Sequence, residues 1–178
     1  MKEKRGQVWV ETVLYTLIGL GLIALVLAFV SPRITQEKEK ILVEQTIQSL
    51  NVIDDKINTV LEKGEGNRRV IEFGIGRGEL YFNSSNDKII FVFNDLKKPY
   101  TEPDVEIEFG RVKILSVEDR RASHVFLTLD YGNIANLTFS GKDEDRKFDA
   151  ASKPYAFSIE NIGRNNSLFE VVDVGLAA

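Results

Sequence analysis

Glu11 is the residue whose chemistry is most unusual for its position, because its carboxylate opens a run that is otherwise suited to lipid. A charged side chain inside a bilayer is costly unless it is paired or reaches the polar interface. Gly6 lies five residues earlier, behind the basic residues Lys2, Lys4 and Arg5. Considered without Gly6, Glu11 is most simply interpreted as hydrated at the level of the lipid headgroups; with Gly6 in place, that interpretation is no longer the favoured one.

Two other motifs have ordinary structural explanations. Gly74, Gly76 and Gly78 in "FGIGRGEL" superficially suggest a phosphate-binding loop. Such a loop should lead into a helix, whereas the following "ELYFN" predicts a strand, so we favour a hairpin turn or a bulge. His124 starts a predicted strand without an evident catalytic partner, and we expect it at a surface or an edge.

The composition excludes several classes of site. The sequence has no cysteine and one histidine, which leaves no thiolate metal site and no ordinary histidine triad. The run "KDEDRKFD" could ligate calcium through Asp143, Glu144, Asp145 and Asp149, but it lacks the glycine of an EF-hand turn, and a solvated loop is favoured. A net charge of −4 argues against nucleic-acid binding. We therefore expect no catalytic residues, no metal and no cofactor.

A membrane-spanning helix is predicted at residues 7–31. No charged residue occurs from Thr12 to Pro32, and the 18 residues Val13–Val30 would form roughly 27 Å of helix, close to the thickness of a bilayer core. The preceding basic cluster predicts a cytoplasmic N-terminus and a C-terminal part outside the membrane. The segment after the run, "AFVSPRITQ", is a poor match to a secretory cleavage site.

Residues 32–64 predict an amphipathic helical stalk. An apolar stripe recurs at steps of three and four residues: Val43, Ile47, Leu50, Ile53 or Asp54, Ile57 and Leu61. Gly64 is placed to follow the end of this helix. The stripe could pack under a domain of the same chain or form a coiled coil with neighbours; because it is not a strict heptad, we favour the first.

Residues 68–178 predict an antiparallel β domain. Runs rich in β-branched and aromatic residues alternate with turn residues, and the segment 104–119, "DVEIEFGRVKILSVED", is among the most regular. In it Val105, Ile107 and Phe109 share one face of a strand, while Glu106 and Glu108 share the other. The expected fold class is α+β: a long N-terminal helix followed by a β-sandwich-like domain.

The combination "KRGQVWVE" followed by an apolar run resembles the class III signal peptide of type IV pilins, especially of archaeal pilins and archaellins. The resemblance implies that residues 1–6 are a cytoplasmic leader peptide, removed by cleavage between Gly6 and Gln7. Glu11 then becomes the fifth residue of the mature chain. In that family, a glutamate at this position is thought to pair with the new N-terminal ammonium of a neighbouring subunit and so to set the register between subunits.

The function implied by the resemblance is that of a non-enzymatic structural subunit, major or minor, of a surface filament. The implied partners are the membrane, a prepilin peptidase, an assembly ATPase with its membrane platform, and further subunits in a homo- or hetero-oligomeric filament. The alternative is an uncleaved single-span protein whose β domain binds a ligand or partner outside the membrane. An anchored hydrolase is a third possibility, for which the sequence shows no nucleophile–base pair.

Three sequons provide candidate glycosylation sites at Asn83, Asn136 and Asn165. Asn83 and Asn165 fall in predicted turns, whereas Asn136 falls in or near a predicted strand.

Overall fold

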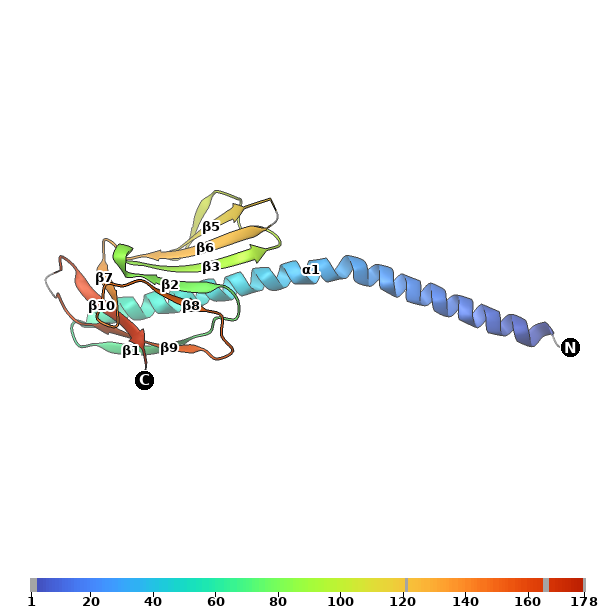
Figure 1. Cartoon of the computed structure of the whole chain (residues 1–178), viewed down its shortest axis with the longest axis horizontal. Coiled ribbons are helices and arrows are strands. Elements are labelled where there is room, and N and C mark those ends of the chain that lie inside the picture. Colours follow the sequence, from blue (N-terminus) through green and yellow to red (C-terminus); the bar gives the residue numbers. More distant parts are fainter. Residues whose placement is uncertain (1–2, 121, 165–166, 178) are drawn as a thin grey trace. The chain divides into compact units, whose positions relative to one another are not determined.

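The computed structural model describes residues 3–120, 122–164 and 167–177, with side chains from residue 9 onward except at positions 31 and 32. The chain divides into two compact units, Met1–Ile41 and Leu42–Ala178. A long helix, α1 (Glu3–Lys63), begins in the first unit and ends in the second. Every strand in the described residues belongs to the second unit (Figure 1).

The part of α1 from residue 42 to residue 63 is amphipathic, as the spacing of its apolar residues predicts. Val43, Ile47, Leu50, Ile53, Ile57 and Val60 are each at most 2% exposed and belong to the main hydrophobic core. The preference for packing within the same chain is therefore confirmed. The helix ends where Gly64 takes a φ of +83° and its N–H donates to the carbonyl of Val60 at 3.1 Å. Glycine adopts this conformation at little cost, which fixes the end of the helix.

The strands form two sheets. The four-stranded sheet has the order β1-β9-β10-β7 and the six-stranded sheet the order β4-β5-β6-β3-β2-β8. A short 3₁₀ helix, η1 (Ser84–Asn86), joins β2 to β3. The bounds of the strands are β1 Arg68–Phe73, β2 Glu79–Asn83, β3 Lys88–Leu96, β4 Glu106–Phe109, β5 Val112–Glu118, β6 Ser123–Asp130, β7 Ala135–Phe139, β8 Arg146–Asp149, β9 Tyr155–Asn161 and β10 Glu170–Leu176.

The predicted α+β class is confirmed, with sheets that are mainly antiparallel. The exception is the parallel pair formed by β7 and β10, in which Ala135 lies beside Glu170 and Phe139 beside Val174. Two local features also differ from the prediction. Residues 104–119 form not one strand but the hairpin β4–β5, which turns at Gly110 and Arg111. The acidic run expected to be a loop contains the short edge strand β8.

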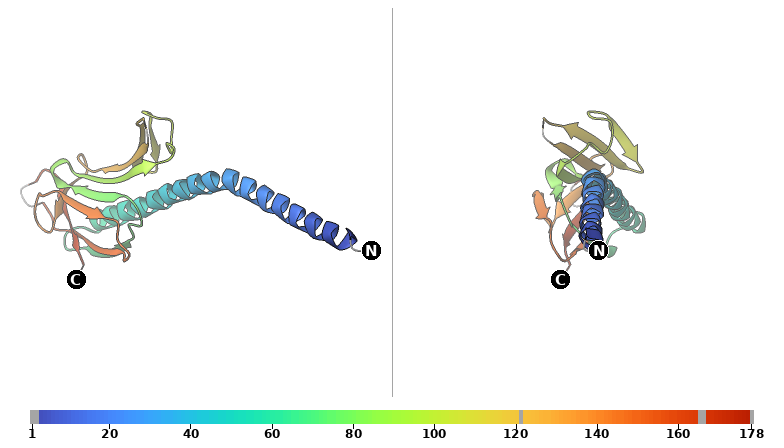
Figure 2. Two further views of the ribbon diagram at one scale, coloured as in Figure 1. Left: turned by 45° about the vertical axis from the view of Figure 1, so that its right-hand side comes forward. Right: turned by 90° about the vertical axis from the view of Figure 1, so that its right-hand side faces the viewer.

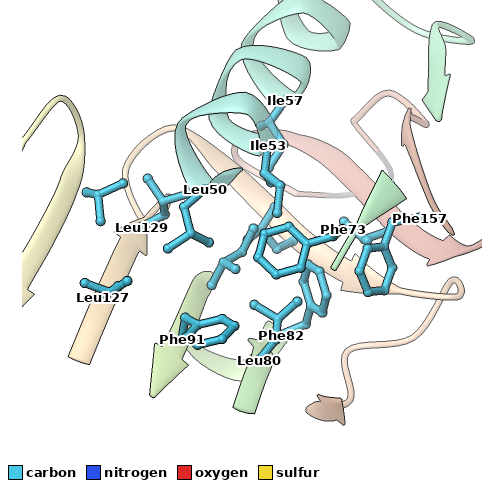
Figure 3. Close-up of a cluster of buried hydrophobic side chains, with 14 of the residues drawn as sticks. Leu50, Ile53, Ile57, Phe73, Leu80, Phe82, Phe91, Leu127, Leu129 and Phe157 are labelled. Atoms are coloured by element: carbon cyan, nitrogen blue, oxygen red, sulfur yellow. The ribbon is translucent and has the colours of Figure 1, made fainter. Parts of the chain in front are cut away.

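The core of the second unit lies between the two sheets, around the C-terminal part of α1. Figure 3 shows Leu50, Ile53 and Ile57 of the helix among side chains from both sheets. Phe73 and Phe157 come from the four-stranded sheet, whereas the six-stranded sheet supplies Leu80, Phe82, Phe91, Leu127 and Leu129. Figure 2 gives two further views of the sheets. Since burial of one such side chain is worth about 2 kcal/mol, the helix is an integral part of this domain.

Candidate functional site

The segment Trp9–Val30 of α1 presents an apolar surface on every side of the helix. Its large side chains are all exposed, from 40% for Val13 to 72% for Phe29, with Trp9 at 70%. The most apolar window of α1 has a mean hydropathy of 2.7, and none of it is buried. By length and composition this helix is able to cross a membrane.

Glu11 is an exposed residue near the start of this apolar segment. The structure places it on the described part of α1, two residues after Trp9, the first residue whose side chain is described. Gly6 and Gln7 also belong to α1, but the surroundings of Gln7's side chain lie outside the described residues. The expected cleavage at Gly6 and the expected register role of Glu11 therefore stay predictions.

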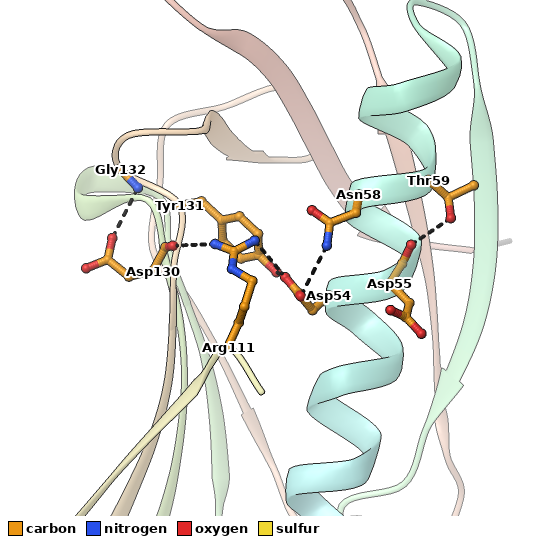
Figure 4. Close-up of polar contacts among 8 residues, drawn as sticks. All are labelled: Asp54, Asp55, Asn58, Thr59, Arg111, Asp130, Tyr131 and Gly132. Atoms are coloured by element: carbon orange, nitrogen blue, oxygen red, sulfur yellow. Dashed lines mark hydrogen bonds and ion pairs between the residues drawn. The ribbon is translucent and has the colours of Figure 1, made fainter. Parts of the chain in front are cut away.

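A polar cluster, defined here as Asp54, Asn58, Arg111, Asp130 and Tyr131, joins the helix to the six-stranded sheet (Figure 4). The phenol of Tyr131 donates to Asp54 Oδ1 at 2.7 Å, and Asn58 Nδ2 donates to Asp54 Oδ2 at 3.1 Å. Arg111 forms an ion pair with Asp54 Oδ1 at 3.1 Å and donates to the backbone carbonyl of Asp130 at 3.0 Å. The guanidinium of Arg111 also lies 5.0 Å from the centre of the Tyr131 ring.

The environment of this cluster suits a structural role. Tyr131 is fully buried, and burial followed by the nearby Asp54 carboxylate raises the pKa of its phenol far above the usual range. The phenol therefore stays protonated and keeps donating its hydrogen bond. Both Asp54 oxygens accept hydrogen bonds from protein groups, which occupies them. The arrangement fixes the rotation of the helix on the sheet and offers no proton acceptor poised for catalysis.

Sequence reasoning did not find this cluster. The one signal was Asp54 itself, which occupies a position on the apolar stripe of the helix. A carboxylate on a buried face requires partners, but the sequence gives no indication which residues supply them. Arg111 and Tyr131 lie 57 and 77 positions further along the chain.

The sequons occupy different environments. Asn83 Oδ1 accepts from the backbone N–H of Asn86 at 3.0 Å and thereby caps η1, so Asn83 lies at a strand end that leads into a turn. Asn136 is half-buried within β7, and the Thr138 hydroxyl of its sequon donates to Asp173 at 2.7 Å. Asn165 lies outside the described residues. Asn83 and Asn136 are both half-buried.

Asp87 follows η1 and has an unusual environment for a carboxylate. It has a φ of +53°, and its Oδ1 accepts from the N–H of Leu137 at 2.8 Å. Burial raises the pKa of this carboxyl, the hydrogen bond from Leu137 opposes the increase, and the negative charges of Asp143 and Asp130 add to it. The contact ties the β2–β3 connection to strand β7.

The weaker motifs have no ligand-binding arrangement in the described residues. No group of three or more potential ligands there is arranged to hold a metal ion. In the acidic run, Glu144 pairs with Arg146 at 3.7 Å, and Asp145 accepts from the Ser85 hydroxyl at 3.1 Å. Gly78 precedes a strand rather than a helix, as predicted, but residues 74–78 join β1 of the four-stranded sheet to β2 of the six-stranded sheet and so do not form the expected hairpin turn. His124 lies in β6 with its Nδ1 at 3.1 Å from the side-chain oxygen of Asn94.

Comparison of the chain with known protein families, with curated proteins and with solved structures finds no match. The class of protein is therefore defined by the structure alone. It is an α+β protein with an N-terminal helix that is long and apolar enough to span a membrane, and with a β domain that includes the end of that helix.

Proposed function

We propose that this chain is a non-enzymatic structural subunit, major or minor, of a type IV pilus-like surface filament. The observation that carries the proposal is the exposure of apolar side chains on every side of the segment Trp9–Val30. Such a surface requires an apolar environment supplied from outside the chain. Lipid supplies it to the precursor, and the same segment of sister subunits supplies it in the filament.

The position of Glu11 supports assembly beyond simple anchoring. Cleavage after Gly6 creates an ammonium group at Gln7, and the carboxylate of Glu11 lies four residues further on. Away from water each charge alone is costly, whereas a pair formed between neighbouring subunits offsets part of the cost for both. Such a pair specifies one axial offset between helices, which a purely apolar surface does not.

The proposed partners follow from this route. A prepilin peptidase cuts the cytoplasmic leader, an assembly ATPase and its membrane platform drive extraction from the bilayer, and further subunits complete the filament. The precursor spans the membrane once with its N-terminus in the cytoplasm. The β domain is then outside, where Asn83, Asn136 and Asn165 are candidates for glycosylation.

Mass spectrometry of the protein from its native cells tests the cleavage directly. We expect an N-terminus at Gln7, and a Gly6→Val variant is expected to retain residues 1–6. Gly19→Val is a matched control, because a Cβ at Gly19 meets nothing within 4 Å and the residue lies away from the cleavage point. An unprocessed N-terminus in the wild-type protein, or cleavage of Gly6→Val equal to that of the control, contradicts the proposal.

Replacement of Glu11 separates assembly from anchoring. Glu11→Gln keeps the size of the side chain and removes its charge, so we expect cleavage and membrane insertion to continue while filament formation falls. Glu37→Gln makes the same change at an exposed position beyond the apolar segment and is expected to leave filaments unchanged. Electron microscopy of shed filaments measures the difference, and equal filament yields contradict the register role.

A second candidate is an uncut, single-span protein whose β domain binds a ligand. The observation in its favour is a cavity of about 270 Å³ lined by Glu44, Ile47, Gln48, Tyr100 and Phe109. This candidate predicts that Gly6→Val matures and functions as the wild-type protein does. Retention of residues 1–6 in functional wild-type protein favours it over the filament.

A further inference from the structure

Strand β4 leaves part of the core face of the six-stranded sheet uncovered. Ile107 lies directly opposite Ile114, and Phe109 lies directly opposite Val112. Residues opposite each other in an antiparallel pair share a face, so both β4 residues are on the core side of the sheet. Yet Ile114 and Val112 are 1% and 0% exposed, whereas Ile107 and Phe109 are 42% and 60% exposed. The apolar core face therefore continues past the point where the chain itself covers it.

The same strand is acidic and lies at an edge. It is the first strand in the order of the six-stranded sheet, so one side of its backbone faces away from the sheet. Glu106 and Glu108 are exposed and alternate with Ile107 and Phe109. Lys113 pairs with Glu106 at 3.4 Å across the hairpin and offsets one of these charges. An edge with exposed apolar residues is prone to pair with another strand.

Strand β1 has the opposite charge at another edge. It is the first strand of the four-stranded sheet and begins with the consecutive residues Arg68 and Arg69. The next residue, Val70, is 57% exposed. The start of this edge therefore combines two cations with an exposed apolar side chain, and the exposed carboxylate of Glu72 follows two residues later.

We propose that β4 of one copy of this chain pairs in antiparallel fashion with β1 of the next copy. This inference rests on the proposed filament and names the contact between the outer domains of neighbouring subunits. Placing Arg68 opposite Glu108 also places Arg69 opposite Ile107, so that its aliphatic stem covers part of the exposed core face. Pairing of β4 with β4 brings Glu106 opposite Glu108 and is disfavoured.

The geometry of this contact produces an open assembly. The two edges belong to different sheets, so each copy offers one acidic and one basic edge. A contact between two different surfaces is heterologous, and it continues from copy to copy unless the rotation closes a ring. In Figures 1 and 2, β1 lies across the second unit from β5, the partner of β4, so a contact between the two edges joins separate molecules.

Disulfide cross-linking of the full chain in native membranes and shed filaments tests the pairing. The sequence has no cysteine, so every disulfide comes from introduced residues. We expect Arg68→Cys with Glu108→Cys to give a ladder of dimers, trimers and longer species under mild oxidation. Either substitution alone is expected to give dimers at most.

The control pair is Arg68→Cys with Asp149→Cys, which replaces Glu108 by a position on β8, the opposite edge of the same sheet. We expect no ladder from this pair. An equal ladder from the control pair, or no ladder from Arg68→Cys with Glu108→Cys, overturns the inference.

Two readouts keep this inference separate from the proposed function. Filaments of cut protein that give no ladder contradict the β1–β4 contact and leave the filament proposal intact. A ladder formed by uncut protein in the membrane supports the contact and contradicts processing. Charge reversal gives an independent check: Glu108→Arg is expected to abolish the β1–β4 contact, and Arg68→Glu in the same chain is expected to restore it. Failure of restoration contradicts pairing through these charges.

Discussion

Removal of the Asp54 carboxylate should destabilise the β domain more than any other single change in a polar residue of the helix. The Asp54→Ala substitution deletes the acceptor for Tyr131 and Asn58 and the ion-pair partner of Arg111. Loss of one partner of a buried ion pair costs about 3–5 kcal/mol of unfolding free energy. The Arg111 side chain is 34% exposed and regains some water, whereas Tyr131 is fully buried and does not. We therefore expect about 3 kcal/mol, at the lower end of that range.

This loss corresponds to a decrease in Tm of roughly 10 °C for a domain of this size. The assay is thermal unfolding of the full chain in detergent, followed by near-ultraviolet circular dichroism of its tyrosines. The only tryptophan is Trp9, in the apolar segment, so tryptophan fluorescence does not report on the β domain. Hydrogen exchange of residues 42–63 gives a second, local measurement, and we expect faster exchange in the variant.

Two further variants bound the interpretation. Tyr131→Phe removes one hydrogen bond and leaves the ion pair, for an expected loss of about 1 kcal/mol. Asp55→Ala removes the neighbouring exposed carboxylate and should change the unfolding free energy by less than about 0.5 kcal/mol. If Asp54→Ala melts within 2–3 °C of Asp55→Ala, by the same scaling, the polar cluster does not hold the helix on the sheet and the reasoning is wrong.

Five other substitutions test separate parts of the β domain. Gly64→Ala should lower the unfolding free energy by about 1 kcal/mol through its positive φ alone. Gly78→Ala should lower it further, because the added Cβ would lie 2.7 Å from the backbone carbonyl oxygen of Val92. Denaturant titration compares the two variants. Asp87→Asn should flatten the pH dependence of the unfolding free energy. The Asp87 carboxyl has a higher pKa in the folded than in the unfolded protein, so it binds a proton more readily when folded. With aspartate in place, stability therefore falls as the pH rises from the unfolded pKa through the folded pKa, and asparagine removes this contribution. Phe91→Ala should lower the unfolding free energy by about 3–5 kcal/mol, as measured by thermal melts. Phe109→Ala, at 60% exposure, should lower it by less than about 1 kcal/mol and should act mainly on association.

Local patterning was enough to predict the helical part of the core. The periodicity of Val43 through Ile57 placed these side chains on one face, and the structure buries them all. The last predicted position of the stripe, Leu61, is wrong by one residue, because Val60 is buried and Leu61 is only half-buried. Residues three and four positions after Ile57 both lie near the same face of the helix, so the spacing alone does not choose between them. Gly64 was identifiable for a similarly local reason, since it follows directly after the last turn.

Features that depend on distant residues were not predictable in this way. The hairpin β4–β5 interrupts an alternation that continues on both sides of it, and its only local signal is Gly110, whose φ is +65° and whose Cβ position lies 2.8 Å from the Asn51 side chain. The parallel pairing of β7 with β10 joins strands more than 30 residues apart. Neither the order of strands nor the partners of Asp54 leave a pattern in any short window of sequence.

Both ends of α1 carry apolar side chains that must be removed from water, and the two ends achieve this by different means. Leu50 and Leu25 are the same residue type in the same helix, yet Leu50 is fully buried and Leu25 is 57% exposed. From residue 42 onward polar residues separate the apolar positions, so two sheets of the same chain suffice to complete the core. From Val13 to Val30 the helix has no polar face, and an apolar surface on all sides can be satisfied only by a surrounding medium or by several neighbours at once. Lipid meets that need without regard to register, whereas neighbouring helices meet it at defined offsets. Under the proposed function, Glu11 bears on the choice between them, because a single carboxylate at the edge of this surface gives no advantage in lipid, whereas its pairing with the N-terminal ammonium of a neighbouring subunit would specify an offset among helices.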